Sequence, residues 1–282
     1  MNTSPLVSVG LPVYNGERDI SRVIGVFLTQ TYTNFELIIS DNASIDQTEK
    51  ICLEFAKNDN RVKYFRQTEN RGALINFKYV LEVAKGDYFM WAASDDFRDV
   101  NFLSECISIL ETNHICIAAT SYDSMIGIND IRKFEAKGDL FQRLMVFLNN
   151  CWNSHGFFYS LIRLNAVKSF DFKYFKGFGA DWSFIIYLIS HGEIHRSSKT
   201  MARFGIDGIS NSDKRYSAFR SGFINWFIPF IDFSKYLILL IKDLKINEKL
   251  TLIERLVKLN YKTAVNQLIF ELKILKKKSY FK

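Results

Sequence analysis

The segment Gly86–Asp96, with the sequence GDYFMWAASDD, is an apolar run that ends in two adjacent carboxylates. A near-continuous apolar run is typical of a strand buried on both faces of a parallel sheet, and open α/β sheets bind ligands beyond the carboxyl ends of such strands. Two neighbouring acids at that position repel each other unless a positive group lies close by. A divalent cation that carries a diphosphate meets this need, because hard cations bind carboxylate and phosphate oxygens. The segment therefore predicts metal-assisted chemistry on a nucleotide.

Before this segment, strand-like and helix-like patterns alternate along the chain. The strand-like runs are 6–13, 35–40, 62–65 and 88–93, and the runs with helical periodicity are 20–28, 46–56 and 74–84. This alternation favours a doubly wound parallel sheet. Beyond it, the sequence predicts helices at 102–111, 140–148 and 181–190, a strand at 115–122, and mixed strand, turn and loop at 156–164 and 193–204.

The charge of the chain is concentrated near its C-terminus. The 282 residues carry a net charge of +7, and residues 242–282 alone hold 11 Lys/Arg against 4 Asp/Glu, so residues 1–241 are neutral. A basic C-terminal segment on a neutral body indicates contact with an anionic surface, of which membrane lipid fits best, and no nucleic-acid partner is expected.

The cysteines and the N-terminus indicate the compartment. The four cysteines are far apart and form no Cys-x-x-Cys pair, which favours reduced core thiols. The short apolar run Leu6–Val13 has no basic region before it, so no signal peptide is expected. We therefore expect a cytoplasmic protein, and a peripheral position on the cytoplasmic face of the inner membrane stays open.

Polar residues close the second predicted strand and precede the third predicted helix. The short side chains of Asp41–Ser44 can hydrogen-bond a base or a ribose, although a turn with an N-cap is the structural alternative. We favour the ligand-binding interpretation because a second acidic strand end, Asp95–Asp96, follows about 50 residues later. Arg71 precedes a helix start, where it and the helix N-terminus could attract a phosphate; a surface arginine in a loop is the alternative. For Asp95–Asp96 the alternative is a helix cap with a solvated neighbour.

Two further residues could act on the acceptor side. Asp181 follows a Gly-rich loop and opens an apolar helix, so it could be an N-cap, but a carboxylate there could also accept a proton from a hydroxyl. The four histidines form no convincing metal set, and among them only His155 is kept as an acceptor-side candidate.

The N-terminal motifs, taken together and in this order, resemble glycosyltransferase family 2, whose members are inverting enzymes with the GT-A fold. The matching segments are Val7–Glu17, Gln30–Glu36, Ser40–Thr48, Asn70–Gly72 and Ser94–Asp96. The resemblance covers about the first 110 residues well and residues 150–210 loosely, and it ends near residue 220.

The resemblance implies an α/β fold of the GT-A type, Rossmann-like, with a mostly parallel twisted sheet and helices on both faces. Residues 1–220 would form the catalytic domain, with a nucleotide-binding half at about 1–110 and an acceptor-binding half at about 111–220. Residues 221–282 would form a basic amphipathic helical tail.

The resemblance also implies roles in donor binding. Pro12 and Tyr14 would line the base pocket, and Asp41 would accept a hydrogen bond from the base, usually uracil. Asp95 would contact the ribose, and Asp96 would ligate Mn²⁺ or Mg²⁺ on the diphosphate. The whole predicted nucleotide-binding set comprises Pro12, Tyr14, Glu17, Asp41, Arg71, Ser94 and Asp95.

On the acceptor side, Asp181 stands where the family keeps its general base. The family often has two acids in a row there, whereas Ala180 precedes Asp181 in this chain. His155 and Trp182 are the predicted acceptor-binding residues.

The predicted function is metal-dependent, inverting transfer of a sugar from a nucleotide-diphospho-sugar, expected to be a UDP-sugar, to a hydroxyl of a glycan or lipid-linked acceptor. Bacterial surface polysaccharide synthesis is the expected setting, and a homo-oligomer stays open. The processive synthases of the family carry a Gln-x-x-Arg-Trp motif and several membrane spans. Neither is found in this sequence, so a single-addition transferase is expected.

Three other classes are considered. A sugar-nucleotide nucleotidyltransferase needs a Gly-rich loop with Arg and Lys after the first strand, where this chain has Tyr14–Glu17. A nicotinamide oxidoreductase would need a Gly-x-Gly-x-x-Gly motif after a strand, which this sequence lacks. A non-catalytic, glycosyltransferase-like binding or scaffold protein is the alternative from a different class.

The segment Phe223–Ile241 is strongly apolar but contains Pro229, Asp232 and Lys235. A bilayer-spanning helix needs about 20 mainly apolar residues, so we do not expect it to span. An interfacial membrane contact through residues 223–282 is one interpretation. A helical pair packed on the catalytic domain or on a second subunit is the other.

Overall fold

The computed structural model of the chain describes residues 4–93, 95–205, 216–220 and 222–279, with side chains as far as residue 274. Its strands are β1 (Val7–Val13), β2 (Phe35–Asp41), β3 (Val62–Arg66), β4 (Tyr88–Trp91), β5 (Phe97–Arg98), β6 (Cys116–Met125), β7 (Leu161–Arg163) and β8 (Glu193–Phe204). The longer helices are α1 (Ile20–Leu28), α2 (Thr48–Asn58), α3 (Ala73–Glu82), α4 (Phe102–Thr112), α5 (Leu140–Asn150), α8 (Ala180–His191), α9 (Ile231–Leu240) and α10 (Ile246–Ser279). The shorter ones are α6 (His155–Phe158), α7 (Leu164–Lys168) and the 3-10 helices η1 (Cys151–Asn153), η2 (Phe172–Tyr174), η4 (Ser217–Phe219) and η5 (Phe223–Trp226).

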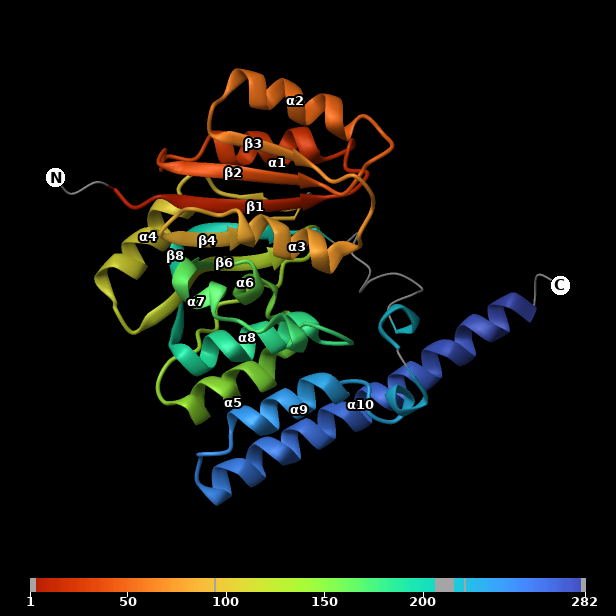
Figure 1. Cartoon of the computed structure of the whole chain (residues 1–282). Helices are drawn as coiled ribbons and strands as arrows, with labels where there is room; N and C mark the ends of the chain where they lie inside the picture. The colour runs from red at the N-terminus through yellow and green to blue at the C-terminus, as the bar shows by residue number, and fades with distance from the viewer. Residues whose placement is uncertain (1–3, 94, 206–215, 221, 280–282) are drawn as a thin grey trace.

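The strands form one sheet in the order β3-β2-β1-β4-β7-β6-β8-β5 (Figure 1). The pairs β1–β2, β1–β4, β2–β3 and β6–β8 are parallel. β7 pairs antiparallel with β4 and β6, and β5 pairs antiparallel with β8. The predicted mostly parallel sheet is therefore confirmed, and the carboxyl ends of β1, β2 and β4 lie at the same edge.

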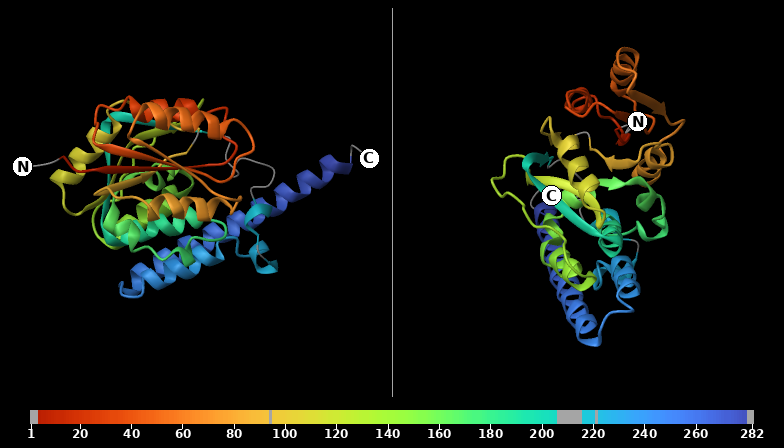
Figure 2. Two further views of the ribbon diagram at one scale, coloured as in Figure 1. Left: turned by 45° about the horizontal axis from the view of Figure 1, so that its top comes forward. Right: turned by 90° about the vertical axis from the view of Figure 1, so that its left-hand side faces the viewer.

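Helices cover both faces of the sheet (Figures 1 and 2). This burial explains why the sequence of β4 is apolar throughout. Consecutive residues of a strand face opposite sides of a sheet. Tyr88 and Met90 lie in the apolar layer that also contains residues of α1, α2 and α4. Phe89 and Trp91 lie in the layer that contains residues of α3, α5 and α8. The near-continuous apolar run thus reflects burial on both faces, as predicted.

Two segments differ from the prediction. The strand expected at 88–93 ends at Trp91, and the chain then turns into β5, which has only two residues and pairs with β8. A two-residue strand has no periodicity by which a sequence pattern could reveal it. The mixed segment 156–164 contains most of α6 and all of β7.

The C-terminal helices pack on the body of the molecule. α9 contacts α8, and α10 contacts α5. Phe233 and Leu237 of α9 and Leu252 and Leu256 of α10 are buried in the same apolar cluster as α8. The predicted C-terminal helical appendage is confirmed, and the second half of α10 extends beyond the body (Figure 1). The domain division predicted at residue 220 stays a prediction.

Candidate active site

The loops that follow β1 and β2 hold each other at the carboxyl edge of the sheet. The backbone N–H of Asn15 donates to Ser44 Oγ (2.8 Å), and Glu17 Oε2 accepts from the backbone N–H of Gln47 (2.9 Å). Gln47 caps α2, so the Glu17 carboxylate lies at a helix N-terminus, where a negative charge is favourable. Glu17 therefore has a structural partner in the fold, and its part in nucleotide binding stays a prediction.

Pro12 and Tyr14 lie at the end of β1, where they were predicted to line a base pocket. Pro12 is half-buried within the strand, and Tyr14 is 46% exposed just after it. An exposed aromatic ring at this edge is suited to stacking on a base, because every base presents a π-face.

Asp41 is buried at the end of β2, and its carboxylate is held by three donors. Its Oδ1 accepts from the backbone N–H of Ser44 (2.8 Å), and its Oδ2 accepts from Tyr64 Oη (2.7 Å) and Arg66 Nη1 (2.9 Å). A carboxylate can accept about four hydrogen bonds, so the predicted bond from a base remains chemically open. No surface of Asp41 is exposed, however, and a base would reach it only after neighbouring side chains move.

Asn42 links this strand end to the loop that carries Arg71. Its Oδ1 accepts from the backbone N–H of Arg71 (3.0 Å), and its Nδ2 donates to Asn70 Oδ1 (2.9 Å). Gly72 follows with a φ of +83°, a backbone conformation that favours glycine, and α3 begins after it. The Arg71 side chain is exposed, which suits the predicted contact with a base or phosphates.

Asp96 is 4% exposed and pairs with a buried arginine. Its Oδ2 accepts from both terminal nitrogens of Arg98 (3.4 Å each), and the guanidinium lies over the rings of Phe102 and Phe204. Burial raises the pKa of Asp96 to about 6; the positive charge of Arg98 opposes this rise, and the negative charge of Asp95 adds to it. Arg98 is a partner that the sequence analysis missed.

Asp95 instead faces a cavity of about 590 Å³, which is lined by Arg18, Asp19, Arg22, Asp95, Phe97, Ile126, Arg203 and Gly205. A Cβ atom on Gly205 would lie 1.8 Å from Asp95 Oδ2, so a glycine there makes room for the carboxylate. Ser94, the third predicted residue of this motif, lies outside the described residues.

The acids at the end of β4 offer carboxylate oxygens, the ligands that Mg²⁺ and Mn²⁺ prefer. A cation beside Asp95 would also relieve the repulsion that helps to raise the pKa of Asp96. Within the described residues, no group of three or more His, Cys, Asp or Glu side chains could hold a metal ion by itself. The residues therefore fit a cation that takes its other ligands from a bound diphosphate. Asp96 as the metal ligand stays a prediction.

Asp181 lies in the first turn of α8, directly after Gly179 and Ala180. Gly179 has a φ of +81°, and a Cβ atom there would meet the ring of Phe230 at 2.9 Å. The surrounding protein raises the pKa of Asp181 to about 6 by burial, which outweighs the backbone N–H groups that favour its ionised form. Such a carboxylate is mostly ionised at neutral pH and basic enough to accept a proton.

The charges of acids from both predicted halves act on Tyr159, a residue that no sequence motif singles out. Burial raises its pKa above the ordinary value, and the charges of Asp96, Asp95 and Asp181 add to the rise. Its ring stacks on Phe204 at the end of β8, with centroids 5.6 Å apart. The predicted donor-side acids and the predicted base therefore lie within electrostatic range of one tyrosine. Because no motif surrounds Tyr159, only the fold reveals this position.

The two predicted acceptor residues lie in different surroundings. His155 begins α6 with its ring 6.2 Å from that of Phe204, and burial lowers its pKa, with Arg132 adding to the effect. Trp182 is 6% exposed and belongs to the core, where it stacks on Phe230 (4.7 Å) and meets the exposed Trp152 edge-on (5.0 Å). Their acceptor roles stay predictions.

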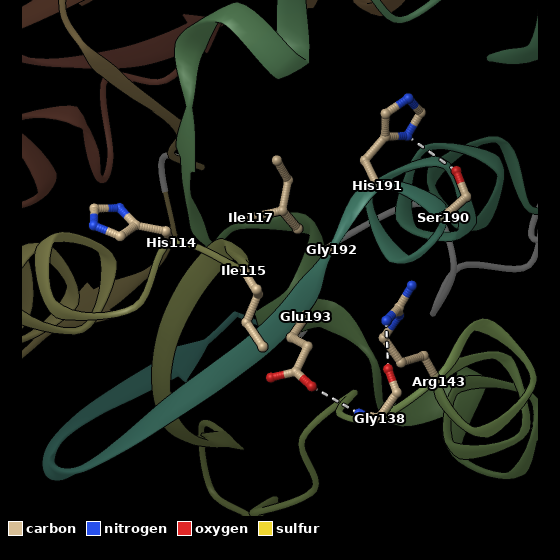
Figure 3. A pocket seen from close by; sticks show the side chains of 9 residues that line it. All are labelled: His114, Ile115, Ile117, Gly138, Arg143, Ser190, His191, Gly192 and Glu193. Carbon is tan, nitrogen blue, oxygen red and sulfur yellow. Dashed lines mark hydrogen bonds between the residues drawn. The ribbon is translucent and has the colours of Figure 1, made fainter.

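A second pocket, of about 450 Å³, lies at the amino ends of β6 and β8 (Figure 3). Glu193 accepts there from the backbone N–H of Gly138 (2.8 Å), and Ser190 Oγ lies 3.0 Å from His191 Nδ1. None of the predicted site residues lines this pocket, so it carries no part of the candidate site.

Comparison with known families agrees with this geometry. The family model described as Glycosyl transferase family 2 matches residues 8–171, more than half of the chain. The chain belongs to glycosyl transferase family 2. The predicted family is thus confirmed, and the matched segment holds the donor-side candidates, whereas Asp181 lies beyond it.

Curated glycosyltransferases are similar to part of this family 2 chain. It is 34% identical over 131 residues to the UDP-Glc:alpha-D-GlcNAc-diphosphoundecaprenol beta-1,3-glucosyltransferase WfgD of Escherichia coli, covering 46% of this chain and 51% of that protein. It is 38% identical over 107 residues to an uncharacterized glycosyltransferase of Rickettsia typhi, covering 38% of this chain and 32% of that protein. The chain therefore matches about half or less of the length of these relatives.

Solved structures match nearly the whole fold. S. aureus TarS 1-349 superposes with a TM-score of 0.66 at 16% identity, covering 90% of this chain and 71% of that one. The mannosyltransferase PcManGT from Pyrobaculum calidifontis, solved with GDP-Man and Mn²⁺, superposes with a TM-score of 0.57 at 16% identity, covering 95% and 75%. At these identities the likeness concerns the fold, and the predicted GT-A class is confirmed.

Proposed function

We propose that this chain transfers a sugar from a nucleotide-diphospho-sugar to an acceptor hydroxyl, with inversion at the anomeric carbon and with a divalent cation. The observation that carries the proposal is the cavity at the carboxyl edge of the sheet that Asp95 lines, next to the buried carboxylate of Asp96. Membership of family 2 supports the reaction class.

The transfer would be a single displacement. Asp181 accepts the proton of the acceptor hydroxyl while the oxygen attacks the anomeric carbon. The bond from that carbon to the diphosphate oxygen breaks at the same time, and its electron pair leaves with the nucleoside diphosphate. Attack opposite the leaving group inverts the configuration.

The donor would lie along the ends of β1, β2 and β4. Tyr14 would stack on the base, and the exposed Arg71 would lie near the base or the phosphates. Asp95 would contact the ribose, and Asp96 would ligate the cation, which when bound neutralises the charge developing on the leaving diphosphate.

The relatives support a UDP-sugar donor and a lipid-linked acceptor. WfgD is named for UDP-Glc and a diphosphoundecaprenol acceptor, and TarS has been solved with UDP and with UDP-GlcNAc. PcManGT, solved with GDP-Man, shows that the fold also accepts another nucleotide. A role in bacterial surface polysaccharide synthesis follows from these relatives by analogy.

A thermal-shift panel with UDP, GDP, dTDP and CDP, each with and without Mn²⁺, tests the proposal. We expect a Mn²⁺-dependent rise in melting temperature with UDP and a smaller rise with the others, because a bound ligand stabilises the folded state. No shift with any nucleotide would favour the scaffold alternative over the transferase.

A further inference from the structure

The long helix α10 has two apolar faces, only one of which packs on the protein. The inner face contributes Leu252 and Leu256 to the core, followed by the buried polar residues Asn260, Thr263 and Gln267. Asn260 fixes this face, because its Oδ1 accepts from the backbone N–H of Phe230 (3.0 Å) and its Nδ2 donates to Ser234 Oγ (3.1 Å). The orientation of α10 on the body is therefore determined.

The outer face of α10 carries a second apolar stripe. Its members are three, four or seven residues apart, which places them on one side of a helix. They are between 37% and 72% exposed: Leu250, Ile253, Val257, Tyr261, Leu268 and Leu272. Exposed apolar side chains scattered singly need no explanation, but a contiguous stripe indicates an interaction surface.

Cations lie along one edge of this stripe. Arg255, Lys262 and Lys273 are exposed and follow one another at helical spacing, and Lys258 between them is paired with Glu254. The nearby acids are engaged within the chain: Glu254 pairs with Lys258, and Glu271 pairs with Arg220. An apolar stripe with a cationic edge is the pattern of a helix that lies in the interface of an anionic bilayer.

A second exposed apolar group lies beside α10. Phe223 and Phe227 are 79% and 63% exposed, and their rings touch edge-to-face at 5.3 Å. Phe223 is the first residue of η5, and Phe227 directly follows its last residue. η5 contacts α10. Arg220, just before η5, lies 3.6 Å from the centre of the Trp226 ring. Exposed aromatic rings near arginine are typical of side chains that sit at the level of lipid headgroups.

This surface is close to the proposed active site. The carboxyl ends of β1 and β2 and the projecting half of α10 lie toward the same side of the molecule (Figures 1 and 2). A chain of aromatic contacts connects them: Phe270 of α10 meets Tyr216 (5.5 Å), and Tyr216 meets Phe178 (5.6 Å), three residues before Asp181. A bilayer against α10 would therefore lie near the acceptor side.

We propose that the outer face of α10, together with Phe223 and Phe227, binds the surface of an anionic bilayer and presents the active site to an acceptor anchored there. The second part rests on the proposed function; the binding of lipid does not. A second copy of the chain is a less suitable occupant, because an antiparallel pair joined through the stripe would bring the two cationic edges together.

Co-sedimentation of the full chain with vesicles tests the proposal. We expect binding to phosphatidylglycerol–phosphatidylcholine vesicles, and weaker binding to phosphatidylcholine alone or at raised salt. The variant Val257→Glu/Leu268→Glu should lower binding at least tenfold, or about 1.4 kcal/mol, because two apolar side chains leave the interface. Leu53→Glu, at an exposed position of α2, is the matched control and should bind like the unchanged chain.

A charge variant tests the cationic edge. Arg255→Gln/Lys262→Gln/Lys273→Gln should weaken binding to anionic vesicles by roughly fivefold per cation and leave binding to phosphatidylcholine unchanged. Light scattering on the same samples reports the oligomeric state. Absence of vesicle binding, or equal binding by Val257→Glu/Leu268→Glu, would overturn the proposal, and a dimer that this variant splits would assign the face to a second copy.

The nucleotide-dependent thermal shift separates the two proposals. Val257→Glu/Leu268→Glu should keep the shift with UDP and Mn²⁺, because its changes are confined to the outer face of α10. Vesicle binding without any nucleotide shift would overturn the transferase and keep the membrane surface.

Discussion

The three acids of the candidate site differ in their immediate surroundings. Asp96 is buried against Arg98, Asp95 faces a cavity, and Asp181 lies in the first turn of α8 without an ion pair to a described residue. All three charges raise the pKa of Tyr159, so removing any one of them lowers that pKa. The different partners nevertheless predict different consequences of mutation.

Asp96→Ala is expected to lower the free energy of unfolding by about 3 kcal/mol, because Arg98 would stay buried without its carboxylate. Asp95→Ala, at the carboxylate that faces the cavity, should remove the Mn²⁺-dependent nucleotide shift. Urea titrations and thermal shifts on both variants measure this. An Asp96→Ala variant as stable as the unchanged chain would contradict a stabilising pair between Asp96 and Arg98.

Asp181→Asn should reduce product formation about 10²- to 10⁴-fold, because the amide cannot take the hydroxyl proton. The dissociation constant for UDP with Mn²⁺ should stay unchanged, since Asp181 lies on the acceptor side. Turnover assays and calorimetry separate the two effects. Retained turnover would place the base at another residue.

The raised pKa of Asp181 predicts a pH dependence of the rate. Because the base acts in its ionised form, kcat should fall about tenfold per pH unit below about pH 6. Burial also makes the folded state bind protons more tightly, so stability declines as pH rises through about 6. Asp181→Asn should weaken this decline; a kcat that is flat down to pH 4.5 would exclude Asp181 as the base.

At the scale of elements, the site is a set of loops that hydrogen-bond one another at the carboxyl edge of the sheet. Asn42 joins the end of β2 to the loop before α3, and the loop after β1 is joined to the start of α2. These bonds connect segments that are about 30 residues apart in the chain. The position of Arg71 therefore depends on a side chain of another loop.

Asn42→Ala removes hydrogen bonds that hold the loop of Arg71. Each lost bond is worth about 1 kcal/mol, so we expect UDP binding to weaken about fivefold per bond. Asn60→Ala, at an exposed position after α2, is the control and should bind UDP normally. Calorimetry on both variants checks the prediction. Equal affinities would mean that the loop is held by other contacts.

At the scale of the whole molecule, the C-terminal helices contribute buried residues to the core. Phe233 of α9 is fully buried and packs against Phe147 and Trp182. The tail and α8 should therefore unfold together. Of the two interpretations of this segment, the structure shows the helical pair packed on the body, and membrane contact stays a prediction.

Phe233→Ala should destabilise the protein by about 3–5 kcal/mol, because it empties a site shared by α5, α8 and α9. Leu239→Ala, at an exposed position of the same helix, should change stability by less than about 1 kcal/mol. Denaturant titration gives both values. Two separate transitions would show that the tail folds independently of α8.

Local sequence patterns were enough to predict the class of fold, the family and the edge of the sheet at which the candidate site lies. β4 is apolar on both faces because both faces are buried, so its pattern was visible locally, as were the polar residues that end β1, β2 and β4. Periodicity reports the burial of an element, and short motifs report turns, because both depend on neighbouring residues.

Packing between distant segments determines which carboxylate faces the cavity, which one pairs with an arginine, and which tyrosine experiences the charges of the acids. Arg98, Gly205 and Tyr159 belong to no motif, and their positions depend on how β5 and β8 close the sheet beside β6. The fold also separated the two faces of α10, because the packing of Asn260 and Leu256 on the body determines which side remains outside. Contacts between residues distant in the chain arise from packing, so a local sequence pattern does not predict them.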